Sequence, residues 1–266
     1  MPQMSSHQPG TPCWAELATP DVEVAKAFYA GLFGWDARTP PDPATGGYTM
    51  FTLGGAEGHE VAAVTPLLAE GRQPVWTGYV SVADTAGACK AVLEQGGHVH
   101  LDPQPVPGRG TAAVCADPMG AVFGLWQPEG FAGAAFAGDR DTFCWSELAC
   151  RDIDAARSFY SAVFGWSAET APFAGGTSTY TTFSLDGRRV AGMVQMNEAW
   201  PAEIPPHWMV YFAADDTDAA CERVTRLGGT VSVPPSDTPF GRLAVVGDPH
   251  GAYFSLIRPA DPLPGA

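Results

Sequence analysis

The sequence predicts an α+β protein that consists of two tandem domains with the same fold. The chain has 266 residues, enough for two domains of ordinary size that each bury a core of their own. Its first half is repeated in its second half, since CWAELATPDVEVAKAFYAGLFGWDA at 13–37 returns as CWSELACRDIDAARSFYSAVFGWSA at 144–168. Within each half, short strand-like segments alternate with two amphipathic helices.

The elements follow one another in the same order in both halves. In the first half, residues 13–18 alternate as a strand does, and residues 22–33 carry apolar side chains at the spacing of a helix face. Asp21 can cap the start of this helix, and Gly34 can end it. The remaining segments predict strands at 48–53 and 61–65, followed by a second unit with a strand at 75–82, a helix at 84–95 and strands at 98–101, 111–115 and 121–126.

The repetition extends to the ends of both halves. YTMFTL from Tyr48 returns as YTTFSL from Tyr180, and DPMGAVFGLWQP from Asp117 returns as DPHGAYFSLIRP from Asp248. A stretch rich in glycine and alanine separates the halves. We therefore predict a flexible N-terminal tail at 1–11, a first domain at 12–130, a linker at 131–141, a second domain at 142–260 and a C-terminal tail at 261–266.

Three motifs identify the family that the chain resembles. They are FYxxxFGW at the end of the first helix (28–35 and 159–166), a glycine pair after the second helix, and DPxG before the last strand. Together they resemble the vicinal oxygen chelate superfamily of glyoxalases, bleomycin-resistance proteins and extradiol dioxygenases. The resemblance implies four βαβββ modules, two per domain, with each pair curled into an open cup. The pattern is most similar to tandem actinobacterial proteins, including those from gene clusters for aromatic polyketide antibiotics.

The superfamily's metalloenzymes hold a divalent ion with histidine, glutamine and glutamate side chains on four strands of the cup. The resemblance places these ligand positions on residues of a different kind in both domains. They fall on Trp14, Ala62–Ala63, Thr77–Gly78 and Gly124, and on Trp145, Ala191–Gly192, Met209–Val210 and Ser255. We therefore expect no metal and no cofactor, and neither a metal-dependent glyoxalase nor an extradiol dioxygenase.

Aromatic side chains are expected to line the cups instead. If Trp14 and Trp145 point inward, strand alternation turns Glu16 and Glu147 the same way. The expected ligand-binding set is completed by repeat-matched aromatic residues and by arginines in the PGRG and FGRL loops, namely Tyr48, Trp76, Arg109, Tyr180, Trp208 and Arg242. Such walls suit a planar aromatic ligand. The alternatives for the aromatic residues are core packing, and for the two glutamates a structural hydrogen bond, a ligand contact or proton transfer.

The composition excludes several partners. With 29 acidic and 14 basic residues, the net charge of −15 disfavours nucleic acids and anionic membranes. No apolar run approaches the roughly 20 residues that span a bilayer, and no signal peptide begins the chain, so we expect a cytoplasmic protein. The six cysteines lack metal-binding spacing and are expected to be reduced and buried. Duplication provides two domains in one chain, which is compatible with a monomer or a homodimer.

These observations favour a metal-independent protein that binds a planar aromatic small molecule. A secondary metabolite is the expected ligand, with self-resistance, carriage or biosynthetic delivery as the role. The alternative is a metal-independent tailoring enzyme that assists cyclisation, rearrangement or hydroxylation of an aromatic polyketide, with Glu16 or Glu147 as acid or base. A third possibility is a protein whose cups no longer bind any small molecule.

Overall fold

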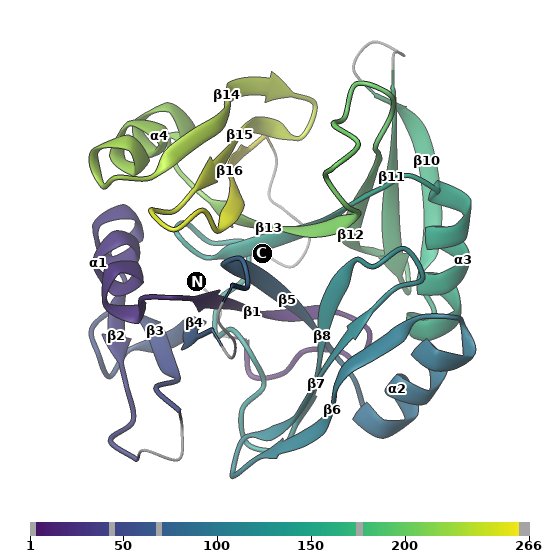
Figure 1. Ribbon diagram of the computed structural model, residues 1–266, viewed down its shortest axis with the longest axis horizontal. Helices are drawn as coiled ribbons and strands as arrows, with labels where there is room; N and C mark the ends of the chain where they lie inside the picture. The colour runs from purple at the N-terminus through teal and green to yellow at the C-terminus, as the bar shows by residue number, and fades with distance from the viewer. Residues whose placement is uncertain (1–3, 43–45, 68–70, 174–177, 261–266) are drawn as a thin grey trace.

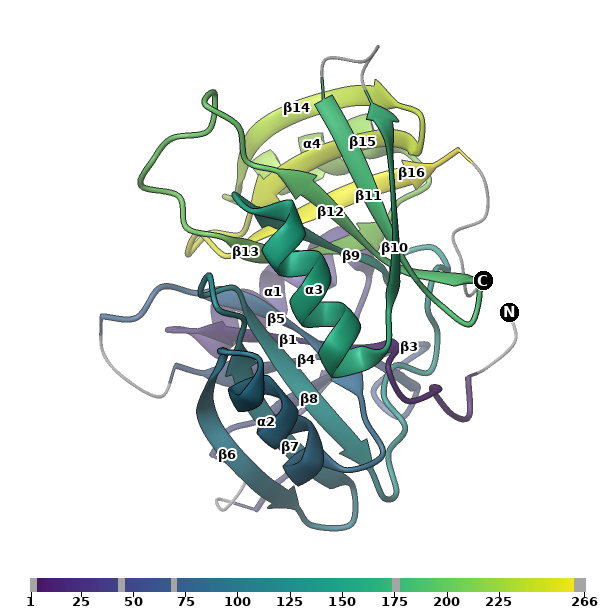
Figure 2. The same ribbon diagram turned by 90° about the vertical axis from the view of Figure 1, so that its right-hand side faces the viewer.

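The computed structural model describes residues 4–42, 46–67, 71–173 and 178–260. This part of the chain contains four helices and sixteen strands. The strands form two eight-stranded sheets, one from each half (Figures 1 and 2). The predicted α+β class and the tandem arrangement are confirmed. The longest helices described have 12 residues, and none of the described helices is long and apolar enough to cross a membrane.

The two halves contain equivalent elements. The first half comprises β1 (Pro12–Thr19), α1 (Val22–Phe33), β2 (Asp36–Arg38), β3 (Thr49–Leu53), β4 (His59–Pro66), β5 (Val75–Ser81), α2 (Thr85–Glu94), β6 (His98–Val106), β7 (Gly110–Ala116) and β8 (Val122–Pro128). The second half comprises β9 (Phe143–Cys150), α3 (Ile153–Phe164), β10 (Ser167–Phe173), β11 (Ser178–Leu185), β12 (Arg188–Gln195), β13 (His207–Ala213), α4 (Thr217–Arg226), β14 (Thr230–Thr238), β15 (Gly241–Gly247) and β16 (Tyr253–Pro259).

Each sheet joins two βαβββ modules through their first strands. The strand order is β2-β3-β4-β1-β5-β8-β7-β6 in the first sheet and β10-β11-β12-β9-β13-β16-β15-β14 in the second. The central pairs β1–β5 and β9–β13 are antiparallel, whereas β1–β4 and β5–β8 are parallel, as are their equivalents. The short strand β2 was not predicted, because three residues are too few to show an alternating pattern.

The helix ends agree with the predicted signals. The Asp21 carboxylate accepts hydrogen bonds from the backbone of Glu23 and Val24 and so caps α1. Gly34 ends the helix with a φ of 71°, in the left-handed region that favours glycine. Asp152 and Gly165 repeat both features at α3. The duplicated sequence therefore fixes where the first helix of each domain begins and ends.

The two largest hydrophobic clusters are shared between the domains, whereas a smaller cluster lies within each half on its own. The larger of the two main clusters combines α1 and its strands with α4 and its strands, and the other combines the modules of α2 and α3. Figure 1 shows α1 beside α4 on one flank of the molecule and α2 near α3 on the other. In each of these two clusters, side chains of a module from one domain pack against side chains of a module from the other domain.

Repeated side chains join the two domains with hydrogen bonds. In one copy, the Trp76 indole donates to the Tyr29 hydroxyl at 2.9 Å, and this hydroxyl donates to the Asp248 carboxylate of the other domain at 3.3 Å. In the other copy, Trp208 donates to Tyr160 at 2.8 Å, and Tyr160 donates to Asp117 at 3.0 Å. The tyrosine of FYxxxFGW and the aspartate of DPxG therefore meet across the domain interface.

The tryptophan of FYxxxFGW also reaches across this interface. Trp166 donates to the backbone carbonyl of Gly10, just before β1, at 2.7 Å. Trp35 donates equivalently to the carbonyl of Asp141, just before β9, at 2.8 Å. The segment 4–11, which we expected to be a flexible tail, is packed against the protein, because the buried His7 also hydrogen-bonds the Ala134 carbonyl.

Candidate ligand-binding cup of the second domain

The concave face of the second sheet forms a pocket, which we call the second cup. In β9 and β13, Trp145 lies opposite Tyr211, and Glu147 lies opposite Met209. Because opposed residues of antiparallel strands point to the same face, these side chains face the cup together. The pocket holds about 490 Å³, open solvent included, and is lined by Trp145, Glu147, Tyr180, Thr182, Arg189, Tyr211, Phe240, Leu243 and Ile257.

Hydrogen bonds connect the polar groups at the floor of the second cup. The Trp145 indole donates to the Tyr180 hydroxyl at 3.1 Å, and the Tyr211 hydroxyl donates to Glu147 Oε1 at 2.8 Å. Gly192 permits this arrangement, because a Cβ there would lie 1.8 Å from the Tyr180 hydroxyl. The glycine at this predicted metal-ligand position therefore leaves room for a tyrosine.

The Glu147 carboxyl is buried beside two tyrosine hydroxyl groups. Burial raises its pKa, and hydrogen bonds from Tyr211 and Tyr180 oppose this effect only partly. Burial and the Glu147 charge also raise the pKa of the Tyr180 hydroxyl, which therefore stays protonated. The floor of the cup thus offers hydroxyl donors and a carboxyl group that protonates more readily than an exposed one.

Phe240 and Arg189 lie at the edge of the second cup. The Phe240 ring packs at 4.6 Å from the Tyr180 ring and extends the aromatic wall. Arg189, on β12, is exposed to solvent and contributes a positive charge to the lining. The second cup therefore combines aromatic walls, a polar floor and a cationic edge.

The first cup has the same floor but is filled by the chain itself. Trp14 donates to Tyr48 at 3.4 Å, and Tyr79 donates to Glu16 at 3.4 Å, as in the second cup. The Phe131 ring then packs edge-on against the Trp14 ring, with 4.9 Å between the ring centres. Phe131 is held in place because its carbonyl accepts a hydrogen bond of 2.8 Å from the Trp126 indole.

An ion-pair cluster covers the Phe131 ring, which we call the aromatic plug of the first cup. The Arg109 guanidinium lies 4.6 Å from the centre of the Phe131 ring and pairs with Glu60 at 2.6 Å. Arg38 pairs with the same carboxylate at 2.7 Å. Of the two predicted cups, the second is therefore the candidate binding site, and the first shows an aromatic ring already seated against its tryptophan.

Two of the predicted lining residues point away from the cups. Trp76 lies opposite Leu17 and Trp208 opposite Leu148, so both indoles occupy the domain interface rather than the concave faces. The prediction that they line the cups was wrong because neighbouring strand residues alternate between faces. Tyr79, three residues after Trp76, faces the cup, and so does its counterpart Tyr211 in the second domain.

The two predicted arginines are not equivalent in the structure. Gly110 and Gly241 begin equivalent strands and pair with equivalent prolines, so Arg109 corresponds to Phe240 and not to Arg242. Arg242 instead pairs with Asp218 and Asp237 outside the lining of the second cup. Arg109 lies over the Phe131 ring in the first cup.

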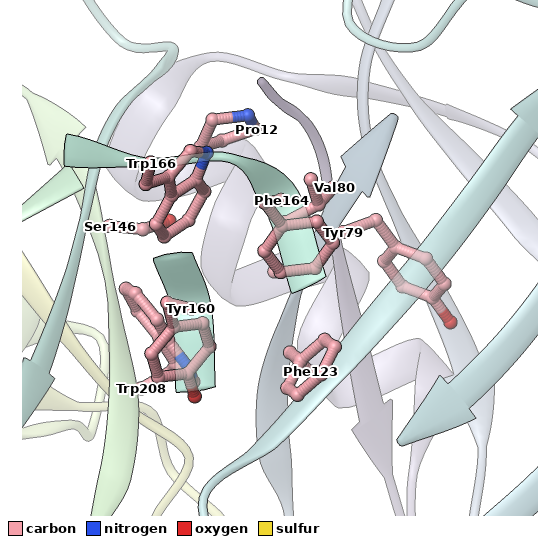
Figure 3. A pocket seen from close by; sticks show the side chains of 10 residues that line it. Pro12, Tyr79, Val80, Phe123, Ser146, Tyr160, Phe164, Trp166 and Trp208 are labelled. Carbon is pink, nitrogen blue, oxygen red and sulfur yellow. The ribbon is translucent and has the colours of Figure 1, made fainter. Parts of the chain in front are cut away.

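A second, mostly apolar space lies between the domains. It holds about 320 Å³, open solvent included, and its lining includes Gly78, Ser146, Tyr160, Trp166 and Trp208. Figure 3 shows these aromatic side chains gathered around the space, with the Tyr79 ring set apart from them. Trp208 therefore lines an interdomain space rather than a cup.

The cup residues do not fit the superfamily's metal. The predicted ligand positions Trp14, Ala63, Thr77 and Gly124 do lie on the concave side of the four central strands of the first sheet, and none of them offers an imidazole or carboxylate. Among the described residues, no three His, Cys, Asp or Glu side chains are grouped closely enough to hold a metal ion.

Comparisons with known proteins agree with this fold. A model of the Glyoxalase/Bleomycin resistance protein/Dioxygenase superfamily matches residues 13–125 and 142–256. The chain is 37% identical over 262 residues to CFP32 of Mycobacterium tuberculosis, provisionally named a glyoxylase, with coverage of 98% of this chain and 99% of the relative. It is also 37% identical over 277 residues to the anthracycline biosynthesis protein DnrV of Streptomyces peucetius, with coverage of 99% and 98%.

Solved structures show the same architecture at low sequence identity. The Mn(II)-bound glyoxalase from Novosphingobium aromaticivorans superimposes with a TM-score of 0.66 at 15% identity, with coverage of 97% of this chain and 84% of the other. The 2,3-dioxygenase LapB from Pseudomonas sp. KL28 superimposes with a TM-score of 0.63 at 14% identity, with coverage of 93% and 91%. At these identities the likeness establishes the fold alone.

Proposed function

This chain belongs to the glyoxalase/bleomycin resistance protein/dioxygenase superfamily, and from that premise we propose that its second cup binds a planar aromatic small molecule without a metal ion. Trp145, Tyr180, Tyr211 and Phe240 supply the aromatic contacts. Hydroxyl groups and the Glu147 carboxyl at the floor supply hydrogen bonds to polar groups of the ligand.

The Phe131 plug is the observation that carries this proposal. The two domains share the same tryptophan, tyrosines and glutamate at the floor of the cup. In the first domain, an aromatic ring is already seated on the tryptophan. In the second domain, the described residues around the equivalent space line a pocket, and Ile257 occupies the position of Trp126. The first cup thus supports an aromatic ring as the occupant of the second.

The relatives support a ligand from secondary metabolism. DnrV and DauV, from two Streptomyces strains, are named anthracycline biosynthesis proteins, and both match this chain over 99% of its length. We accordingly propose a role in self-resistance, carriage or biosynthetic delivery of an aromatic metabolite. Metal independence is part of the proposal, because the ligand positions of the superfamily carry aromatic and small residues here.

Calorimetric titration with an uncharged planar probe, 2-(hydroxymethyl)anthraquinone, tests the proposed binding. We expect one site per chain and affinity that is unchanged after dialysis against EDTA. Trp145→Ala should weaken binding about tenfold or more, because the ring face that stacks on the ligand is lost. Trp200→Ala, which removes a tryptophan outside the lining of the second cup, should leave affinity unchanged. No binding by the wild type, or binding only with a divalent ion, would contradict the proposal.

The raised pKa of Glu147 favours one second candidate function, proton transfer in a tailoring reaction. Glu147 faces the pocket, and burial favours its protonated form, the form that a general acid needs. Glu16 has a similar environment but faces the plugged cup. The enzyme hypothesis predicts that Glu147→Gln retains probe binding yet abolishes conversion of an aromatic polyketide. Unchanged turnover in this variant would exclude the role.

A further inference from the structure

The edge of each cup carries one charged side chain at an equivalent position of its fourth strand. In the first domain, Glu60 on β4 lies opposite Thr52 of β3. In the second domain, Arg189 on β12 lies opposite Ser184 of β11. Both positions follow a register shift at the same place in the β-ladder, which confirms their equivalence. The charge at this edge is therefore reversed between the two domains.

In the first domain, the charge at this position is neutralised within the protein. The Glu60 side chain is only 15% exposed and pairs with both Arg38 and Arg109. Arg109 in turn lies over the Phe131 ring that fills the cup. The charged edge and the aromatic occupant of the first cup thus form one closed unit.

In the second domain, the corresponding charge is open to a ligand. Arg189 is exposed and lines the pocket. In the second domain, Glu169 occupies the position that Arg38 has in the first domain. Whereas Arg38 pairs with Glu60, no carboxylate among the described residues forms an ion pair with Arg189. Phe240 occupies the position of Arg109, so the second cup has an additional ring where the first has a cation.

An exposed guanidinium at the edge of an aromatic cup recognises a particular kind of group. Its planar donors bind a carboxylate through two parallel hydrogen bonds. The protein as a whole carries a net charge of −15 and repels anions, so a cation that lines the pocket is an exception to the surrounding charge. In the first domain, Glu60 at the equivalent position forms ion pairs with both Arg38 and Arg109 at the edge of the cup.

We propose that Arg189 makes the second cup selective for planar aromatic acids, with the ring between Trp145 and Phe240 and the carboxylate on the guanidinium. The inference rests on the proposed function and names the ligand class of that site. In the first domain, Phe131, Arg109 and Glu60 show the same combination of a seated ring and a charge pair made by the protein alone.

Three anthraquinone probes of nearly equal shape test this inference by calorimetric titration. They carry a carboxylate, a carboxamide or an aminomethyl group at carbon 2. We expect the carboxylate to bind the wild type at least about tenfold more tightly than the carboxamide, and the ammonium-bearing probe to bind most weakly. Arg189→Gln should reduce the ratio between carboxylate and carboxamide affinities to about one, because it weakens carboxylate binding far more than carboxamide binding.

Arg188→Gln is the matched control, because it removes the same charge from the neighbouring exposed residue, which does not line the pocket. This variant should keep the preference for the carboxylate. Equal binding of all three probes, tighter binding of the ammonium-bearing probe, or a preference that survives Arg189→Gln would overturn the inference and leave the proposed function standing. Absence of binding by every probe would overturn both.

Discussion

Glu147 is a buried residue whose protonation should make the stability of the protein depend on pH. Its folded-state pKa is raised by burial, so the folded protein retains this proton at pH values above about 4.5 where the unfolded chain has lost it. Stability is therefore lost as the pH rises through this window. We predict that Glu147→Gln, which retains an acceptor for the Tyr211 hydroxyl, has a higher Tm than the wild type at pH 8, and that the difference shrinks toward pH 4.

Thermal unfolding followed at pH 4, 5, 6, 7 and 8 would measure this difference. Glu169→Gln, on an exposed strand residue of the same domain, serves as the control and should show no such trend. A Glu147→Gln variant that loses stability equally at every pH would show that the side chain acts through shape or hydrogen bonding and not through its charge.

The sequence predicted the centre of each cup better than its sides. Alternation along one strand was enough to place Trp14 with Glu16 and Trp145 with Glu147. It could not place Trp76, because that required the register between β1 and β5, in which Trp76 lies opposite Leu17 and not opposite Trp14.

Among the connecting segments, the linker 131–141 does more than join the domains. Phe131 is partly buried in the first cup, and its loss should open that cup. We predict that Phe131→Ala binds two anthraquinone probes per chain where the wild type binds one. Removing a partly buried ring should also cost about 2–3 kcal/mol of the free energy of unfolding, somewhat less than for a fully buried one.

Calorimetric stoichiometry and denaturant unfolding would check both parts of this prediction. Phe136→Ala is a control within the same segment, since its ring packs beside His59 and not in the cup. Unchanged stoichiometry in Phe131→Ala would show that the first cup is closed by more than this ring. Composition alone identified the segment as a linker, but its two phenylalanines among small residues gave no sign of where either ring would pack.

Strand β5 presents two opposite faces, and glycines near each face should respond differently to substitution. A Cβ at Gly78 would lie 3.4 Å from the Ser146 hydroxyl and 4.0 Å from Val210, an ordinary contact that fills part of the interdomain space (Figure 3). We predict that Gly78→Ala stabilises the protein by about 0.4–1 kcal/mol. Gly124→Ala should destabilise it, because the added Cβ would lie 2.2 Å from the Tyr79 ring.

Denaturant midpoints of the two variants would distinguish these effects. Equal stabilities would show that the interdomain space is not available to a methyl group or that the Tyr79 ring moves aside without cost.

At the scale of the whole molecule, the shared cores should make the two domains unfold together. Each main cluster contains side chains from both halves, and the Tyr–Asp and Trp–carbonyl hydrogen bonds cross the interface in both copies. We predict one calorimetric transition, with a calorimetric enthalpy equal to the van't Hoff enthalpy. Two separable transitions would show that the halves are independently stable.

The pairing of modules across the interface could not be read from the sequence. All four modules carry similar strand and helix patterns, so the patterns do not distinguish a helix that packs on its own domain from one that packs on the other. The motifs that identified the fold turned out to be interface contacts, since Tyr29 meets Asp248 and Tyr160 meets Asp117.

The aromatic plug implies that natural selection acts differently on the two halves of the gene. On the proposed function, a cup filled by Phe131 is selected for stable packing, whereas the second cup is also selected for binding a ligand. Relatives that take different ligands should therefore diverge mainly around Arg189, Phe240 and Leu243, while Trp14 and Phe131 persist together or are replaced together. On this view, duplication supplied one half as a scaffold and left the other free to follow the chemistry of its ligand.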